Sequence, residues 1–350
     1  MKAFYCICGN RLFFENTHCG RCGRLLGYDA EAQTMLPLEQ TDNGAWCSPC
    51  PTAAGIDYRM CRNATEYQAC NWLLRADAPG EYCRACCLNR TIPNLGSPQG
   101  LRRWQAVETA KRHLVYSLLK LDLPVVSKRE DAGRGLAFDF LEDQSLNPHV
   151  TEQYVATGHG GGVITINVAE ADDAARERAR DQMNEPYRTL VGHFRHESGH
   201  YYWERLVRDS AWLEPYRHHF GDERADYAAA MRKYHAHGPV ENWRGTFISA
   251  YACAHPWEDW AETWAHYLHM IDTLETAVSF GVAAPAMEQL DFEQRLGEWM
   301  KLTILMNALN RSMGVQDAYP FVLAPPAADK LRFVHRVITH HSAASPASAA

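Results

Sequence analysis

The sequence predicts an α+β protein in which a cysteine-rich N-terminal region precedes a mainly helical domain with a small β-sheet. Eleven of the twelve cysteines lie before residue 88, and apolar residues at helical spacing begin only after that point. Two strand-like segments then precede a series of helix-like ones, an order typical of α+β domains. Hydrophobic residues make up 46% of the chain and charged residues 22%, as expected of a folded protein.

The first four cysteines form two close pairs, Cys6 with Cys8 and Cys19 with Cys22. A close pair places two thiolates on one side of a tight turn, and four thiolates suit a tetrahedral zinc ion with no open position for chemistry. The spacing therefore predicts a structural zinc ribbon. An iron site of the same geometry is the alternative.

A second zinc site is predicted among the next cysteines, which offer more thiols than one ion takes. They are Cys47, Cys50, Cys61, Cys70, Cys83, Cys86 and Cys87. The C-x-x-C pair at 83 and 86 supplies one half of the site. Spacing leaves the other half open between the pair at 61 and 70 and the pair at 47 and 50. The isolated Cys253 is interpreted as a small buried residue.

The remaining chain is predicted to be mainly helical. Strands are expected at 136–143 and 160–168, and helices at about 172–183, 187–206, 223–235, 256–271 and 292–313. The small, polar C-terminal residues predict a disordered tail. The predicted segments are the zinc ribbon (1–30), the second cysteine-rich region (31–98), the helical domain (99–340) and the tail (341–350).

The stretch HFRHESGH contains a metal-binding pattern, HExxH, formed by His196, Glu197 and His200. Residues four apart share one face of a helix, so two imidazoles at this spacing can chelate one zinc ion. The glutamate between them is placed to take a proton from a zinc-bound water.

A third ligand is expected in YACAHPWEDWAETWAHYLHM, where Glu258 and Glu262 are four apart on a helix entered by Pro256. Both carboxylates then project from one face. One can bind the metal, and the other can accept a hydrogen bond from the second nitrogen of a ligating histidine. Spacing alone does not order them.

These motifs resemble those of the gluzincin metallopeptidases, in which HExxH is followed by a ligand glutamate and an acidic residue four positions later. Tyr251, seven residues before Glu258, matches a tyrosine that lies at the metal in lethal-factor-like toxins. The segments CNWLL, NRTIPNL, HESGHYYW, HPWEDWAETWAHYLHM and LNRSMG are more closely similar to bacterial zinc-binding metallopeptidases with an N-terminal zinc ribbon, over residues 4 to 338.

The resemblance implies a zincin-like fold, a peptidase activity, and Cys61 and Cys70 as partners of the 83/86 pair. It also implies one catalytic and two structural zinc ions. We expect His196, His200 and Glu258 to bind the catalytic zinc, with Glu262 bonded to a ligating histidine. The alternative exchanges the two glutamates.

The expected reaction is the attack of water on a peptide bond, with Glu197 as general base. Tyr251 is expected to donate a hydrogen bond to the oxyanion, with His255 and His266 as competitors for that role. The strand GGGVITINV is a candidate edge for pairing with an extended peptide, and a glycine turn before a core strand is the alternative.

The net charge of −7 and the isoelectric point near 6.2 disfavour nucleic acid as a partner, although Arg11, Arg21 and Arg24 could form a small basic face. No apolar stretch is long enough to span a membrane, and the start lacks a signal-peptide pattern, so a cytoplasmic protein is expected. The expected partner is a peptide or protein substrate. The alternatives are another hydrolytic reaction, or an inactive or masked zincin fold whose zinc-ribbon region binds a protein or nucleic acid.

Overall fold

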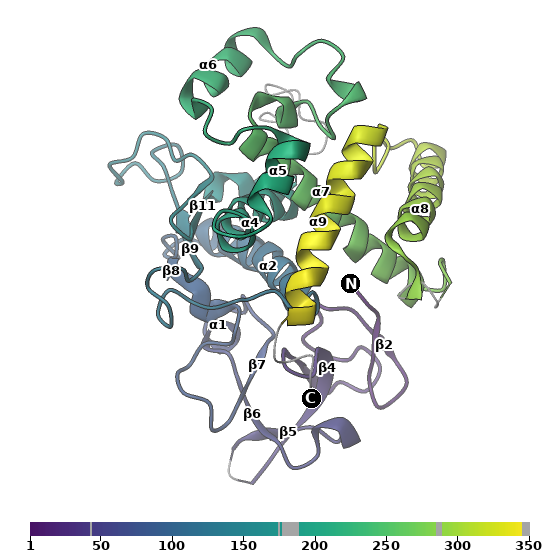
Figure 1. The fold of residues 1–350 in the computed structure, drawn as a ribbon. Helices are drawn as coiled ribbons and strands as arrows, with labels where there is room; N and C mark the ends of the chain where they lie inside the picture. Colours follow the sequence, from purple (N-terminus) through teal and green to yellow (C-terminus); the bar gives the residue numbers. More distant parts are fainter. Residues whose placement is uncertain (43, 174–175, 177–188, 285–288, 345–350) are drawn as a thin grey trace. The chain divides into compact units, whose positions relative to one another are not determined.

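The computed structural model describes residues 1–42, 44–173, 176, 189–284 and 289–344 (Figure 1). They divide into two compact units. The first contains residues 1–120, 124–157 and 165–172, and the second contains 121–123, 158–164 and the described residues from 173 onward. The predicted class is confirmed, because small strands of a cysteine-rich region precede a mostly helical part with a small sheet.

The cysteine-rich part of the first unit is built from short antiparallel strands. A hairpin of β1 (Phe4–Tyr5) and β2 (Arg11–Leu12) comes first. A five-stranded meander follows in chain order: β3 (Leu25–Asp29), β4 (Thr34–Gln40), β5 (Trp46–Cys47), β6 (Asp57–Met60) and β7 (Leu73–Arg75). Helical turns are short here: η1 (Pro51–Ala53), α1 (Arg62–Thr65) and η2 (Cys86–Leu88). Such short elements bury little apolar surface, so bound metal is the expected source of added stability.

An aromatic cluster joins these strands to the long helix α2 (Pro98–Lys120) within the first unit. The ring of Phe14 lies 4.9 Å from that of Tyr28 and 5.3 Å from that of Tyr116 on α2. Tyr28 in turn lies 4.8 Å from Trp72. All these centroid distances are in the range of favourable edge or tilted contacts, so α2 packs as part of the cysteine-rich unit.

A small sheet follows α2. In it β9 (Ala137–Leu141) lies between the parallel strand β8 (Asn89–Thr91) and β11 (Val163–Asn167), and η3 (Val168–Ala171) follows β11. The edge strand β10 (Gly158–Gly160) pairs with β11. The strands predicted at 136–143 and 160–168 correspond to β9 and β11.

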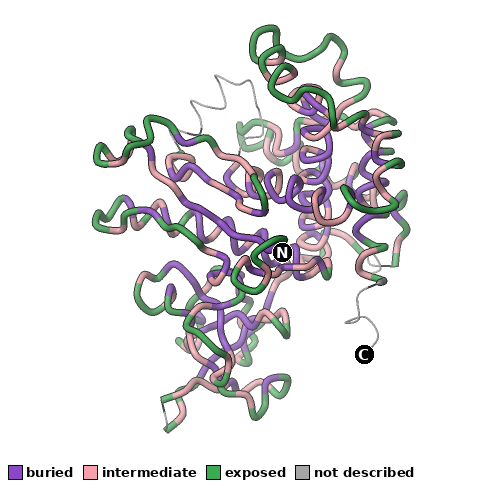
Figure 2. The backbone as a smooth tube through the Cα atoms, turned by 60° about the vertical axis from the view of Figure 1, so that its left-hand side comes forward, coloured by how far each residue is buried: buried purple, intermediate pink, exposed green. Residues whose placement is uncertain are grey.

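The second unit is mostly helical. Its helices are α4 (Leu190–Leu206), α5 (Leu213–Phe220), α6 (Tyr227–His237), α7 (Pro256–Ser279), α8 (Phe292–Ser312) and α9 (Pro325–Ala344), with turns η4 (Trp243–Gly245) and η5 (Tyr251–Ala254). Four of them overlap the helices predicted from 187 onward. The helix predicted at 172–183 falls almost wholly outside the described residues. Helix α6 has no buried residue and lies among the green and pink stretches at the top of Figure 2.

Among the described helices of the second unit, α5 and α9 were not predicted. Helix α9 begins with two prolines, which suggest a loop but are compatible with a first helical turn because its N–H groups have no intrahelical partner. It continues to Ala344, so residues 341–344 of the predicted tail are helical, and 345–350 lie outside the described residues. The Ser342 hydroxyl donates 2.8 Å to the Leu121 carbonyl, which holds this last turn.

The helices α4 and α7 cross at very short range, at Gly199. A Cβ atom on Gly199 would lie 2.9 Å from the Cα of Ala261 and 3.2 Å from the Cβ of Trp264. The indole of Trp260 donates 2.8 Å to the carbonyl of Gly199, and that of Trp264 donates 3.1 Å to Ser198 Oγ. This crossing turns the HExxH face of α4 toward the glutamates at the start of α7.

In the part of the chain that the structure describes, no helix is long and apolar enough to cross a membrane.

Candidate metal sites

Three donor atoms meet between α4 and α7. The Nε2 atoms of His196 and His200 lie 3.2 Å apart. Oε2 of Glu258 lies 3.0 Å from the first of these nitrogens and 3.6 Å from the second. A tetrahedral zinc ion with bonds of about 2.0–2.1 Å holds its ligand atoms about 3.3 Å apart, so this triangle fits one zinc ion.

The electrostatics of the triangle favour a cation. Glu258 is 1% exposed, and its Oε2 has no hydrogen-bond partner among the described residues. Burial raises the pKa of Glu258, but His200 and His196 outweigh it and hold that pKa well below its usual value. Burial lowers the pKa of His196, whereas Glu258 and Glu262 raise it well above normal. A buried carboxylate beside two ring nitrogens is stabilised by positive charge, which either a metal ion or a proton on His196 supplies.

The second carboxylate, Glu262, lies on the other nitrogen of the same histidine. Its Oε1 is 2.7 Å from His196 Nδ1, and its Oε2 accepts a 2.5 Å hydrogen bond from Ser249. The Ser249 hydroxyl oxygen accepts from the backbone N–H of Ala252 at 3.1 Å. An imidazole that donates from Nδ1 keeps Nε2 free to bind a metal, so this chain of contacts selects the tautomer that a ligand needs.

Glu197 lies on α4 between the two histidines and is 7% exposed. Its Oε2 has no hydrogen-bond partner among the described residues. Burial is the main cause of its raised pKa, and the charges of His196 and His200 oppose that shift. A buried carboxyl with a raised pKa beside a metal-binding triangle is typical of a proton-transfer group.

The predicted oxyanion group and its two competitors differ in position. Tyr251 lies on η5, its ring centroid is 5.8 Å from that of His196, and burial raises its pKa. His255 caps α7 by accepting from the Trp257 N–H, and its Nε2 lies 3.1 Å from the Ala225 carbonyl. Nδ1 of His266 lies 3.1 Å from the Tyr319 hydroxyl, and burial lowers the pKa of His266 to about 4. Both histidines are thus engaged in other contacts.

Sequence reasoning missed Tyr227, the first residue of α6. Its hydroxyl donates 2.7 Å to Oε1 of Glu258, the oxygen that does not face the histidines. Asp226 positions the helix start by accepting from the Ala229 N–H at 2.9 Å. No motif or periodicity relates Tyr227 to a glutamate 31 residues later, so the sequence offers no signal for this contact.

The edge strand β10 lies beside the triangle within the second unit. The ring of His159 stacks on that of His200, with centroids 6.4 Å apart and planes at 19°. The His159 ring is oriented by a hydrogen bond from the Gly162 N–H to its Nε2, at 3.1 Å. The predicted edge is therefore wrong, because the strand of the GGGVITINV segment, β11, lies between β10 and β9, and β10 is the edge strand next to the metal-binding residues.

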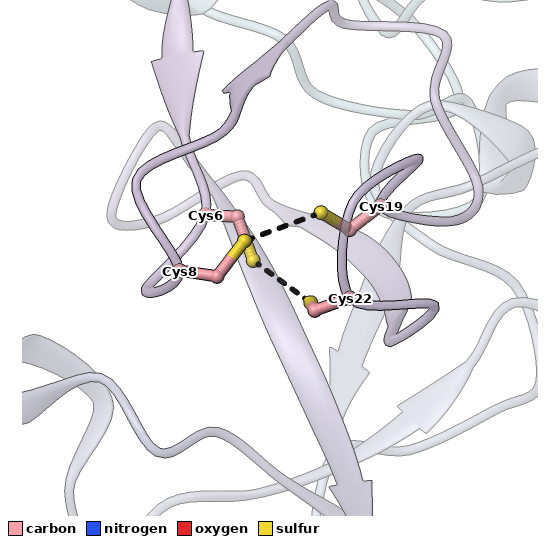
Figure 3. Close-up of side chains that lie close together, drawn as sticks. All are labelled: Cys6, Cys8, Cys19 and Cys22. Carbon is pink, nitrogen blue, oxygen red and sulfur yellow. Dashed lines mark hydrogen bonds between the residues drawn. The ribbon is translucent and has the colours of Figure 1, made fainter.

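The first cysteine group converges from two loops, as Figure 3 shows. Sγ of Cys6 lies 3.6 Å from Sγ of Cys22, and Sγ of Cys8 lies 3.6 Å from Sγ of Cys19. A disulfide would bring two sulfurs to about 2.05 Å. Tetrahedral zinc with bonds of about 2.3 Å holds sulfurs about 3.8 Å apart, so the group fits zinc.

A second group of four thiols is fully buried. It consists of Cys61, Cys70, Cys83 and Cys86, whose sulfurs all lie within 4.8 Å of one another. The Cys70 and Cys83 sulfurs are 3.7 Å apart, again suiting zinc. Cys47 instead lies 3.6 Å from the Glu39 carbonyl, and within the described residues neither it nor Cys50 joins a metal-binding group. The structure thus brings together the pair at 61 and 70 with the pair at 83 and 86.

Comparison with known proteins agrees with this geometry. Residues 3–97 match the model of a zinc-ribbon domain, and residues 100–337 match that of a family described as "Putative zinc-binding metallo-peptidase". Uncharacterised proteins of Mycobacterium tuberculosis and Mycobacterium bovis are 41% identical over 347 residues, covering 97% of this chain and 95% of theirs. No solved structure matches the chain. The chain therefore belongs to this zinc-binding metallopeptidase family, as its motifs suggested.

Proposed function

We propose that this protein hydrolyses peptide bonds as a zinc-dependent metallopeptidase. His196, His200 and Glu258 hold the zinc ion, and Glu197 is the general base. The observation that carries the proposal is the triangle of two Nε2 atoms and one carboxylate oxygen, with edges of 3.0 to 3.6 Å. Three protein donors leave the fourth tetrahedral position for water or substrate, as catalytic zinc sites require.

When bound, zinc polarises a carbonyl and lowers the pKa of a water that it holds toward about 7. The protein's part begins with orientation. Glu262 accepts from Nδ1 of His196, which directs Nε2 of that ring into the triangle. Tyr227 occupies the outer oxygen of Glu258, which leaves the inner oxygen as the ligand atom.

Glu197 takes the proton of the attacking water and delivers it to the leaving amine nitrogen. Its burial supports this role, because a carboxyl whose pKa is raised exchanges protons more readily near neutral pH. Tyr251 donates a hydrogen bond to the oxygen that becomes negative as the carbonyl is attacked. The 5.8 Å between the rings of Tyr251 and His196 supports that assignment.

The substrate is a peptide in extended conformation, paired with the edge strand β10. Two of its three residues are Gly158 and Gly160, which allow close approach of another backbone. The stacking of His159 on His200 supports the pairing, because it puts this edge next to the metal-binding residues.

The two cysteine groups hold one structural zinc ion each, which makes three zinc ions per chain. The supporting observations are two sulfur separations of 3.6 Å in the first group and one of 3.7 Å, between Cys70 and Cys83, in the second. Thiolate sites with all four positions filled contribute to folding and leave no place for a reaction.

The test begins with zinc per chain, measured by elemental mass spectrometry on the wild type and on His200→Ala. We expect about three zinc ions falling to two. Glu197→Gln should keep all three and lose roughly 10²- to 10⁴-fold of the cleavage rate in a peptide-library digest read by mass spectrometry. A count of two in both proteins, or full activity of Glu197→Gln, would overturn the proposal and favour a binding role for the zinc-ribbon region.

A further inference from the structure

Helix α2 places a buried ion pair directly against the second cysteine group. The Cys86 thiol donates 3.4 Å to Oε2 of Glu108, and the Lys111 ammonium donates 2.8 Å to Oε1 of the same carboxylate. Both charged side chains are 0% exposed. Asn89 bridges them, since its amide nitrogen donates 2.7 Å to Glu108 and its amide oxygen accepts from Lys111.

The next residue of α2 brings a second buried cation to the same group. Arg112 donates to the carbonyl of Ala69, which precedes Cys70, and to Thr109 Oγ1 at 3.2 Å. Neither partner carries a charge. Arg112 is 5% exposed, so its guanidinium charge is buried beside the backbone that leads into Cys70.

The net charge of a zinc-loaded cysteine group explains why two cations are buried beside it. Four thiolates around one divalent zinc ion leave two excess negative charges, which burial makes costly. All four cysteines are buried, whereas Cys8 and Cys22 of the first group are partly exposed and water can screen that site.

We infer that Lys111 and Arg112 are the buried counter-charges of the zinc-loaded second cysteine site, and that α2 is therefore a structural part of that site. The inference rests on the proposed structural zinc. The negative charge of Glu108 disfavours the zinc-loaded site, because its carboxylate faces the Cys86 sulfur, which loses its proton when zinc binds. It holds Lys111 in place at an electrostatic cost to the loaded site.

The thiols of the second site and their counter-charges match two different family domains. The zinc-ribbon model ends at residue 97 and the metallopeptidase model begins at residue 100, so the four thiols match one model and their counter-charges match the other. The aromatic contacts of Tyr116 with Phe14 and Tyr28 join the same two segments. The two matched segments are therefore linked through the charge balance of one metal site.

The experiment measures how fast each cysteine group loses its zinc in the full-length protein. Wild type, Lys111→Met and Glu108→Gln are incubated with excess chelator and N-ethylmaleimide, and alkylation of each cysteine is followed by peptide mass spectrometry. The first cysteine group is the control within each molecule. Lys120→Met, a cation lost from the end of the same helix, is the matched control variant.

We expect Lys111→Met to accelerate alkylation of the second group by about 10- to 100-fold, the usual cost of losing a residue that supports a metal ligand. The first group should be unaffected, as should both groups in Lys120→Met. Glu108→Gln should slow alkylation of the second group, because it removes negative charge and the amide can donate to the Cys86 thiolate.

Two results would overturn the inference: an unchanged rate in Lys111→Met, or an acceleration in Glu108→Gln as large as that in Lys111→Met, which would indicate packing. Failure of the underlying zinc proposal has a different signature. In that case, adding chelator does not change the alkylation rate of the second group in the wild type. Misfolding is distinguished from both because it would expose the first group as well.

Discussion

Nδ1 of His196 lies 2.7 Å from Oε1 of Glu262, while Nε2 of the same ring lies 3.0 Å from Oε2 of Glu258. One imidazole therefore separates two carboxylates that share a helix face. The carboxylate at Nε2 also reaches His200, at 3.6 Å, whereas the one at Nδ1 is held by Ser249. The two glutamates are thus expected to contribute to zinc binding by different means.

Replacement of each glutamate by alanine should separate these roles. Glu258→Ala removes a ligand, so we expect one zinc ion fewer per chain in elemental mass spectrometry. Glu262→Ala leaves the three donors in place and should weaken zinc binding by about 10- to 100-fold, measured by chelator competition. If Glu262→Ala lost the ion and Glu258→Ala retained it, the order of the two residues would be reversed.

Tyr227→Phe should lower the zinc affinity of the histidine site by up to about tenfold. The variant loses only the hydroxyl that donates to Glu258, and the carboxylate can then rotate away from the triangle. Tyr216→Phe is the matched control, because its hydroxyl donates 2.9 Å to the Pro256 carbonyl at the start of the same helix. The control should cost about 1 kcal/mol of unfolding free energy and leave zinc affinity unchanged. Equal effects of the two variants on zinc affinity would contradict the prediction.

Gly199→Ala should destabilise the protein by about 1–3 kcal/mol, because the new methyl group would meet the backbone of Ala261 and force α4 and α7 apart. For Gly297→Ala on α8, we expect the unfolding free energy to change in the opposite direction. Nothing lies within 4 Å of its Cβ position, and alanine in an exposed helix should stabilise by up to about 1 kcal/mol. Denaturant unfolding measures whether the unfolding free energy falls in Gly199→Ala and rises in Gly297→Ala.

Stability should fall as the pH is lowered from about 6.5 to about 4, in part because of His266. Burial lowers its folded-state pKa to about 4 from the usual 6.5, so the unfolded chain binds the extra proton first. The loss should be on the order of 3 kcal/mol and complete below the folded pKa. His266→Gln should lose less stability over this range, measured by thermal unfolding at matched zinc content. Parallel pH profiles for the two proteins would count against a neutral buried His266.

The sequence was most informative where function depends on spacing along one helix. His196 and His200 share a face because they are four residues apart, and the same rule placed Glu258 and Glu262 together. It did not order the two glutamates, because their order depends on how α4 crosses α7 at Gly199. Tyr227 was missed for a related reason, since it reaches Glu258 through packing between elements. Lys111 pairs with Glu108 on its own helix, and only the packing of α2 brings that pair against Cys86.

Helix α9 was overlooked although Leu331, Val334 and Ile338 recur at helical spacing and are buried. The contact of its Lys330, by contrast, gave no signal in the sequence. The Lys330 ammonium lies 2.6 Å from Oδ2 of Asp259 on α7, and both side chains are almost fully buried. A buried ion pair between distant segments leaves no periodic trace in the sequence.

The backbone contact at Gly199 also bears on which cation the histidine centre selects. A centre whose helices already touch cannot widen without losing that contact, so its ligand spacing is close to fixed. Calcium requires bonds of about 2.3–2.6 Å and six or more oxygen ligands, which neither the separation of these helices nor their imidazoles can offer. Ions of zinc's size that accept nitrogen donors fit without rearrangement. The imidazole donors therefore disfavour calcium, and the contact at Gly199 limits how far α4 and α7 can separate to admit a larger ion.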